Sequence, residues 1–172
     1  MTLEDSILGA WGTSNRVTIF LVEKLPPAIW GAAVPDVPRR TVRSIAAHVH
    51  NSRCGWIRTL GWDLGISAPE RVDPFRASRR DVVRALARSG KGLGRLLELA
   101  LEKGGTLPAS SKYVWRNLPL DVASVLSYFV AHEGHHRGQL VMIARQLGYR
   151  LPVSTTGGLW DWTHRSKEAK RG

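Results

Sequence analysis

Apolar residues recur at intervals of three and four along four segments of the chain, which is the spacing of amphipathic helices. The segments cover residues 3–23, 41–64, 78–103 and, with each end uncertain by one residue, 120–147. No segment shows the alternation of β-branched residues that is typical of a strand. Amphipathic helices bury their apolar faces by packing together, so the pattern predicts an all-α fold, a four-helix bundle.

Residues at the segment ends support these helices. Thr2, Thr41 and Ser78 stand where the first three begin, and each can accept a hydrogen bond from a free backbone N–H group. Asp5 occupies the third position of a capping box with Thr2, where Glu or Gln is usual. Residues that stop helices follow the segments, namely Pro26 and Pro27, Gly65, Gly104 and Gly105, and Gly148.

Two connections and one helix interior carry residues that disfavour regular structure. We expect the Pro-rich connection AAVPDVPRR and residues 106–119 to form loops. Three glycines, at positions 90, 92 and 94, lie inside the third helical segment and weaken it locally, which would permit a break there.

The chain after Gly148 has no clear helical pattern, and we expect it to be irregular, with Trp160 and Trp162 packing back on the bundle. We therefore expect residues 1–163 to form one domain and residues 164–172 to form a flexible basic tail.

Composition fits a globular chain. With 172 residues, 43% of them hydrophobic, the chain can bury a core within a single domain. No uninterrupted apolar run reaches the length of about 18 residues that spans a bilayer, and the acidic start MTLEDSILGAW does not resemble a signal peptide. The single cysteine, Cys54, excludes an intrachain disulfide and fits a reducing compartment. We expect a cytoplasmic protein.

The net charge of +11 does not change the expected class of protein, but it raises the question of an anionic partner. Such an excess can attract phosphates or other anions. The basic residues are spread over the chain and do not alternate with aromatic residues, as they would on a platform for single-stranded nucleic acid. We therefore interpret them as solvated helix faces and do not favour a nucleic-acid partner, which remains an alternative.

Two histidines of the fourth segment share one helix face. His132 and His136 are four residues apart, the spacing that suits two ligands of one metal ion. At about 100° per residue from Phe129, the centre of the apolar stripe, His136 falls at about −20° and His132 at about −60°. His135 falls at about −120° and faces elsewhere. The helical wheel therefore places His132 and His136 inside the bundle.

The second segment supplies a third candidate ligand. His48 lies at about −60° from Ile45 on the apolar stripe, whereas His50 lies at about 140°, almost opposite. Buried histidines are more often hydrogen-bonded core residues than metal ligands. Two neutral imidazoles without a shared partner are costly to bury, and a third on a facing helix strengthens the case for a metal. We predict a divalent metal ion between His48, His132 and His136.

Other polar residues near these histidines have two interpretations. Glu133 falls at about 40° on the same wheel and is a candidate general base, or else a hydrogen-bonded carboxylate. Arg137 is a candidate for a substrate carboxylate or for an inter-helix salt bridge. Cys54 points away from the histidines at about 180°, so we expect it to be inert. Three tryptophans could line a pocket or belong to the core, namely Trp56, Trp62 and Trp115.

At these residues the chain resembles the DinB-like, or YfiT-like, family of metalloenzymes. The matching pieces are SIAAHV followed by Trp56, the block HEGHHRGQL and the continuation ARQLGYRLP. The resemblance runs from the first helix to Pro152. It implies an up-down-down-up four-helix bundle that is commonly a homodimer. It also implies one metal ligand on the second helix and two on the last, which correspond to His48, His132 and His136.

The resemblance also suggests a chemistry. Characterised relatives include transferases and isomerases that use a low-molecular-weight thiol, such as mycothiol, bacillithiol or glutathione, while most members have no assigned reaction. We therefore expect an enzyme that depends on a divalent metal, with zinc or nickel favoured and iron or manganese as alternatives. Its substrate would be a small electrophile. The alternative is a metal-binding, stress-linked bundle protein without catalysis.

Overall fold

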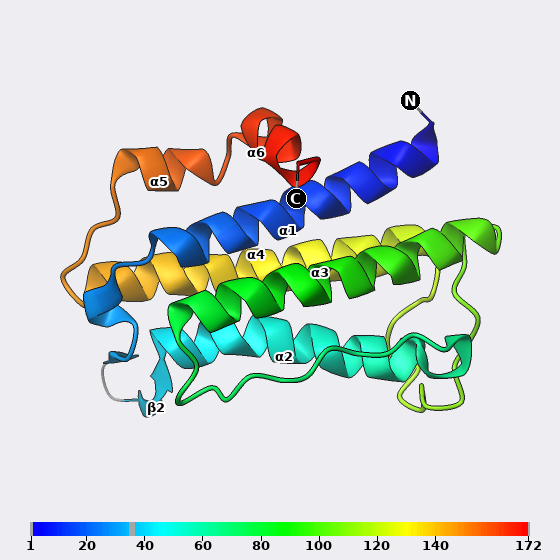
Figure 1. Ribbon diagram of the computed structural model, residues 1–172, viewed down its shortest axis with the longest axis horizontal. Helices are drawn as coiled ribbons and strands as arrows, with labels where there is room; N and C mark the ends of the chain where they lie inside the picture. Colours follow the sequence, from blue (N-terminus) through cyan, green and yellow to red (C-terminus); the bar gives the residue numbers. More distant parts are fainter. Residues whose placement is uncertain (1, 35–36, 172) are drawn as a thin grey trace.

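The computed structural model describes residues 2–34 and 37–171. Four long helices form the bundle: α1 (Leu3–Lys24), α2 (Val42–Leu60), α3 (Arg79–Glu102) and α4 (Val122–Gln146). In Figure 1, α1 and α4 run in one direction and α2 and α3 in the other. A crossover, residues 61–78, joins α2 to α3 by returning along the length of the bundle (Figure 1). This is the expected up-down-down-up topology.

Capping interactions set the helix starts, as predicted. Thr2 and Asp5 form the capping box of α1, and Ser78 forms one with Asp81 at α3. Thr41 caps α2. This helix ends at Leu60, four residues before the predicted end, and a short 3₁₀ helix, η2 (Trp62–Leu64), follows it.

Helix α3 is continuous, so the break that its glycines would permit does not occur. The glycines allow neighbouring helices to approach closely. A Cβ atom at Gly90 would lie 2.5 Å from the side chain of Asn15 on α1, and one at Gly92 would lie 2.8 Å from Ile57 on α2. The indole of Trp11 also donates to the Gly90 carbonyl over 2.8 Å. Tertiary packing thus outweighs the weak helix propensity of glycine.

The connection between α1 and α2 contains more regular structure than expected. A short 3₁₀ helix, η1 (Pro27–Ile29), precedes two strands, β1 (Ala33–Val34) and β2 (Val37–Thr41). The strands pair in antiparallel register, Ala33 with Thr41 and Val34 with Val37. The expectation of a plain loop is therefore wrong for the described part of this segment, since backbone pairing needs no long apolar alternation.

The chain after α4 is helical, in contrast to the predicted irregular tail. It forms α5 (Val153–Gly158) and α6 (Trp162–Ala169), and α6 packs on α1 (Figure 1). Glu168 of α6 forms a 2.7 Å ion pair with Arg16, and the guanidinium of Arg165 lies over the Phe20 ring. Trp160 is 84% exposed, so the prediction that it packs back on the bundle is wrong.

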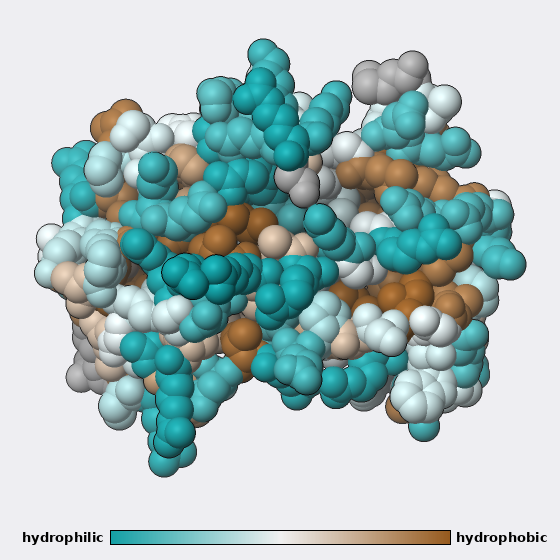
Figure 2. All heavy atoms as spheres, in the orientation of Figure 1, coloured by the Kyte–Doolittle hydropathy of each residue, from teal (hydrophilic) through white to brown (hydrophobic). Residues whose placement is uncertain are grey.

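The apolar core runs along the bundle axis in two clusters, one around Leu21, Val49 and Ile143 and the other around Leu60, Leu97 and Phe129. Figure 2 shows hydrophilic side chains over much of one face, with hydrophobic side chains visible in the hollows between them. Within the described residues, no helix is both long enough and apolar enough to cross a membrane.

Candidate metal centre

His48, His132 and His136 converge between α2 and α4. One ring nitrogen from each histidine lies within 4.8 Å of the other two. The Nε2 atoms of His132 and His136 are 3.2 Å apart, and the ring centroids of His48 and His136 are 4.7 Å apart. The predicted convergence of imidazoles from two helices is therefore present.

Only His136 of the three is fully buried, which corrects the predicted placement of the other two inside the bundle. His136 is 8% exposed, His132 is half-buried and His48 is exposed. The offset of about 60° between His48 and the apolar stripe accounts for this position, since a residue at the edge of a stripe meets solvent. The histidine trio is consequently accessible to small molecules.

The donor set fits a divalent transition-metal ion. Two nitrogens that bind one ion tetrahedrally at about 2.0–2.1 Å are about 3.3 Å apart, close to the 3.2 Å between His132 and His136. A shared ion cannot hold two such nitrogens more than about 4 Å apart. The His48 nitrogen lies within 4.8 Å of both, and the solvent-facing position of its ring leaves it free to adjust to a shared ion.

Gln139 orients the last ligand. Its Oε1 atom lies 2.9 Å from Nδ1 of His136, where it accepts a hydrogen bond from the protonated nitrogen. This tautomer leaves the Nε2 lone pair free for a metal, an arrangement common among metal-binding histidines. The amide nitrogen of Gln139 contacts Nε2 of His135 over 2.8 Å. His135 is exposed and lies outside the trio, as the helical wheel predicted.

The electrostatic surroundings keep the trio neutral. Burial lowers the pKa of His132 to about 4, and the neighbouring histidines add to this effect. Burial also lowers the pKa of His48 and of His136, and the positive charge of Arg40 lowers both further. At neutral pH the three imidazoles are therefore unprotonated, the form that binds metals.

Glu133 lies in the core next to His132 in sequence and forms polar contacts there. Its side chain is 0% exposed and receives two hydrogen bonds from Arg53, of 2.7 and 2.8 Å. The Thr18 hydroxyl donates a third over 2.7 Å. Arg137 lies 3.9 Å away and donates to Thr18 across the helix interface. These contacts are those of a hydrogen-bonded carboxylate, and a catalytic role for Glu133 stays a prediction.

His50 and Cys54 lie on the face of α2 that the helical wheel placed opposite the apolar stripe, yet both are 0% exposed. The reason is that α2 packs on α3 as well as on α4, so it buries two faces. His50 contacts the Ser89 hydroxyl at 3.0 Å and the Glu70 carbonyl at 2.9 Å. Burial raises the pKa of the Cys54 thiol and so favours its unreactive protonated form.

A cavity of about 460 Å³ adjoins the trio on the side of β2. It is lined by Val37, Arg39, Arg40, Ser44, Ile45, His48 and His136. The two arginines were not recognised from the sequence as site residues. They precede α2 in the chain, and only the fold of β2 brings them beside a histidine of α4.

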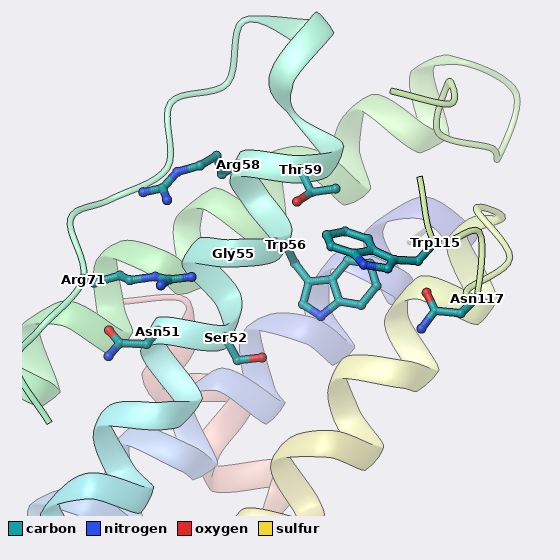
Figure 3. A pocket seen from close by; sticks show the side chains of 9 residues that line it. All are labelled: Asn51, Ser52, Gly55, Trp56, Arg58, Thr59, Arg71, Trp115 and Asn117. Atoms are coloured by element: carbon teal, nitrogen blue, oxygen red, sulfur yellow. The ribbon is translucent and has the colours of Figure 1, made fainter. Parts of the chain in front are cut away.

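Aromatic residues of α2 and α4 continue the row of ring contacts that begins at the trio. The Tyr128 ring stacks on His132 with centroids 6.0 Å apart, and Trp56 meets Tyr128 edge-on at 5.2 Å. Trp56 and Trp115 line a second cavity (Figure 3), whereas Trp62, which is 55% exposed, lines a separate cavity of about 410 Å³. The sequence left open whether these tryptophans line a pocket, and the structure shows that all three do, in two different cavities.

Comparison with known proteins agrees with this architecture. The family model described as the DinB family matches residues 2–170. Neither the comparison with curated proteins nor that with solved structures gives a significant match. Because the family model covers almost the whole chain, including both helices that carry the histidine trio, the chain belongs to the DinB family.

Proposed function

We propose that the chain is an enzyme that binds one divalent metal ion through His48, His132 and His136 and transfers a thiol to a small electrophile. The convergence of three neutral imidazoles from two helices carries this proposal. Three protein ligands leave coordination positions open, which is typical of catalytic rather than structural metal sites. A metal ion held there would act as a Lewis acid that lowers the pKa of a bound thiol or water.

Residues around the trio orient one ligand, leave access for a substrate and supply positive charge. Gln139 fixes the tautomer of His136, and the exposed edge of His48 leaves the site open to a substrate. Arg39 and Arg40, which line the adjoining cavity, supply positive charge. This charge suits a low-molecular-weight thiol that carries carboxylates, since guanidinium groups bind carboxylates well.

The first experiment is metal analysis of the purified protein, followed by thiol consumption assays. Cysteine, glutathione, mycothiol and bacillithiol would each be mixed with a model electrophile, before and after chelation. We expect about one metal ion per chain and turnover with at least one thiol that chelation abolishes. Zinc and nickel are the metals that we favour, and iron and manganese would be tested beside them because imidazole sites accept several divalent ions.

Two other results would redirect the proposal. Stoichiometric metal without turnover on any thiol would favour the alternative of a stress-linked metal-binding protein without catalysis. Absence of stoichiometric metal under all loading conditions would remove both functions. The homodimer implied by the family resemblance stays a prediction, which light scattering on the purified chain would test.

A further inference from the structure

A second cavity, of about 470 Å³, lies one helical turn along α2 from His48. Its lining is formed by Asn51, Ser52, Gly55, Trp56, Arg58, Thr59, Arg71, Trp115 and Asn117. Gly55 forms the floor, because it presents no side chain on this face of α2. Figure 3 shows arginine side chains on one side of Gly55 and indole rings on the other. The proposed thiol chemistry makes no use of this cavity.

The cationic side of the cavity consists of Arg58 and Arg71. The Arg71 guanidinium reaches over Gly55, 3.5 Å from where a Cβ atom would stand. Neither guanidinium forms an ion pair or hydrogen bond within residues 2–34 and 37–171. The described residues that line the cavity include no carboxylate. Two guanidinium groups therefore share one opening to whose lining the described residues contribute no counter-charge.

The aromatic side consists of Trp56 and Trp115. Trp115 is 62% exposed, an unusual position for a large indole, and its ring meets that of Trp56 at 6.4 Å. The neighbouring Arg116 has φ of 48°, a left-handed conformation that non-glycine residues rarely adopt. Such conformations persist where surrounding contacts hold them, and they are frequent at ligand sites.

The loop that carries Trp115 is fixed on both sides. Asp63 accepts two hydrogen bonds from Ser111, of 2.6 and 3.0 Å. The Tyr113 hydroxyl donates to the Leu118 carbonyl over 2.8 Å and accepts from the Leu118 amide. The loop on both sides of Trp115 is thus ordered before any ligand arrives, which reduces the entropy lost on binding.

We propose that this cavity binds a small aromatic oxyanion, with its ring against Trp56 and Trp115 and its carboxylate or phosphate group on Arg58 and Arg71. Guanidinium groups bind both kinds of oxyanion through paired N–H donors. A planar ring gains contact area on exposed indoles. The site needs no metal, so the proposal goes beyond the proposed function and stands independently of it.

The probes are 2-naphthoate and 2-naphthyl phosphate, with uncharged 2-naphthalenemethanol as the matched neutral compound. Binding to the full chain would be measured by titration calorimetry at a fixed ionic strength, with and without metal. We expect at least one oxyanion to bind about tenfold more tightly than the neutral compound, as one charge-assisted contact provides. Equal binding of all three compounds, or none at all, would overturn the proposal.

Arginine variants distinguish oxyanion binding in this cavity from the general attraction of anions to a chain of net charge +11. Arg58→Gln and Arg71→Gln should each weaken oxyanion binding about tenfold. Arg150→Gln, which removes an exposed arginine outside the cavity lining, should leave it unchanged. Equal losses in Arg71→Gln and Arg150→Gln would contradict a specific site.

Two further variants test the aromatic side and the floor. Trp115→Ala should weaken binding of all three naphthyl compounds, whereas Trp160→Ala, at a more exposed tryptophan outside the lining, should not. Gly55→Leu fills the floor without changing charge and should abolish binding. His136→Ala should lose metal but retain oxyanion binding, so that failure of the metal centre and failure of this site give different results.

Discussion

The guanidinium of Arg53 on α2 and the carboxylate of Glu133 on α4 form a two-point ion pair in the bundle core, with contacts of 2.7 and 2.8 Å. The two side chains are 1% and 0% exposed. Arg53 also donates to Asn15 of α1 and to the Leu86 carbonyl of α3, so the pair contacts all four helices. It therefore fixes α2 against α4, the two helices that carry the histidine trio.

Removal of one partner from this ion pair should destabilise the protein strongly. Glu133→Gln leaves the Arg53 charge buried without its counter-charge, and we expect a loss of about 3–5 kcal/mol in the free energy of unfolding. Replacement of both partners by apolar residues, Arg53→Met with Glu133→Leu, should restore part of that loss. Denaturant unfolding of the two variants measures both quantities.

The same double variant tests the predicted catalytic role of Glu133. If the carboxylate only positions the helices, the folded, metal-loaded double variant keeps most of its activity. A folded and metal-loaded double variant without turnover would show that the carboxylate takes part in the reaction.

The histidines of α4 should differ sharply in their effect on metal content. His136→Ala removes a nitrogen of the trio and should abolish stoichiometric metal binding, whereas His135→Ala should leave it nearly unchanged. Metal analysis of both purified variants after identical loading gives the comparison. Equal losses in the two variants would show that the trio is wrongly assigned.

Gln139 should control metal affinity without being a ligand. Gln139→Ala removes the acceptor for Nδ1 of His136, and loss of such a partner lowers metal affinity about 10- to 100-fold. Gln146→Ala, at the exposed end of α4, serves as the matched control. Competition with a chromogenic chelator measures the affinities, and an unchanged affinity in Gln139→Ala would exclude this role.

Acid should destabilise the metal-free protein through its imidazoles. His132 has a folded pKa of about 4 and a reference pKa of 6.5, so between these values the unfolded chain binds more protons than the folded chain. The free energy of unfolding should therefore fall as the pH drops from about 6.5 to 4. The lowered pKa values of His48, His50 and His136 act in the same direction.

Unfolding of the metal-free protein by urea at a series of pH values measures this dependence. The His132→Gln variant should show a shallower decline than the parent chain over the same interval. Identical slopes for the two proteins would mean that His132 is not held in its neutral form by the fold.

The glycines of α3 should respond differently to an added methyl group. Gly90→Ala places a Cβ atom 2.5 Å from Asn15, which binds Arg53, and we expect a loss of about 1–3 kcal/mol. Gly94→Ala meets its nearest neighbour, Trp11, at 3.7 Å and should instead gain about 0.5–1 kcal/mol from helix propensity. Thermal unfolding of the two variants measures whether stability falls in Gly90→Ala and rises in Gly94→Ala.

The features that could be predicted from the sequence are those that depend on local structure. Caps such as Thr2 and Ser78 bond to backbone groups three residues away, so they can be recognised in the chain. The spacing of His132 and His136 likewise follows from helix geometry alone. His48 could be grouped with them because it lies at the edge of an apolar stripe, although the wheel could not tell that its ring meets solvent.

Packing between elements determines which helices bury two faces and which distant residues come into contact, and neither could be predicted from the sequence. Arg53 and Glu133 are 80 positions apart in the chain. Trp115 contacts Trp56 because of the fold of its loop, whose left-handed residue, Arg116, could not be predicted from the sequence pattern. The burial of His50 and the helical α6 also depend on partners supplied by other elements, α3 and α1. Periodicity along one helix reports a single preferred face, whereas packing against several neighbours sets the second face and the pairs that cross between helices.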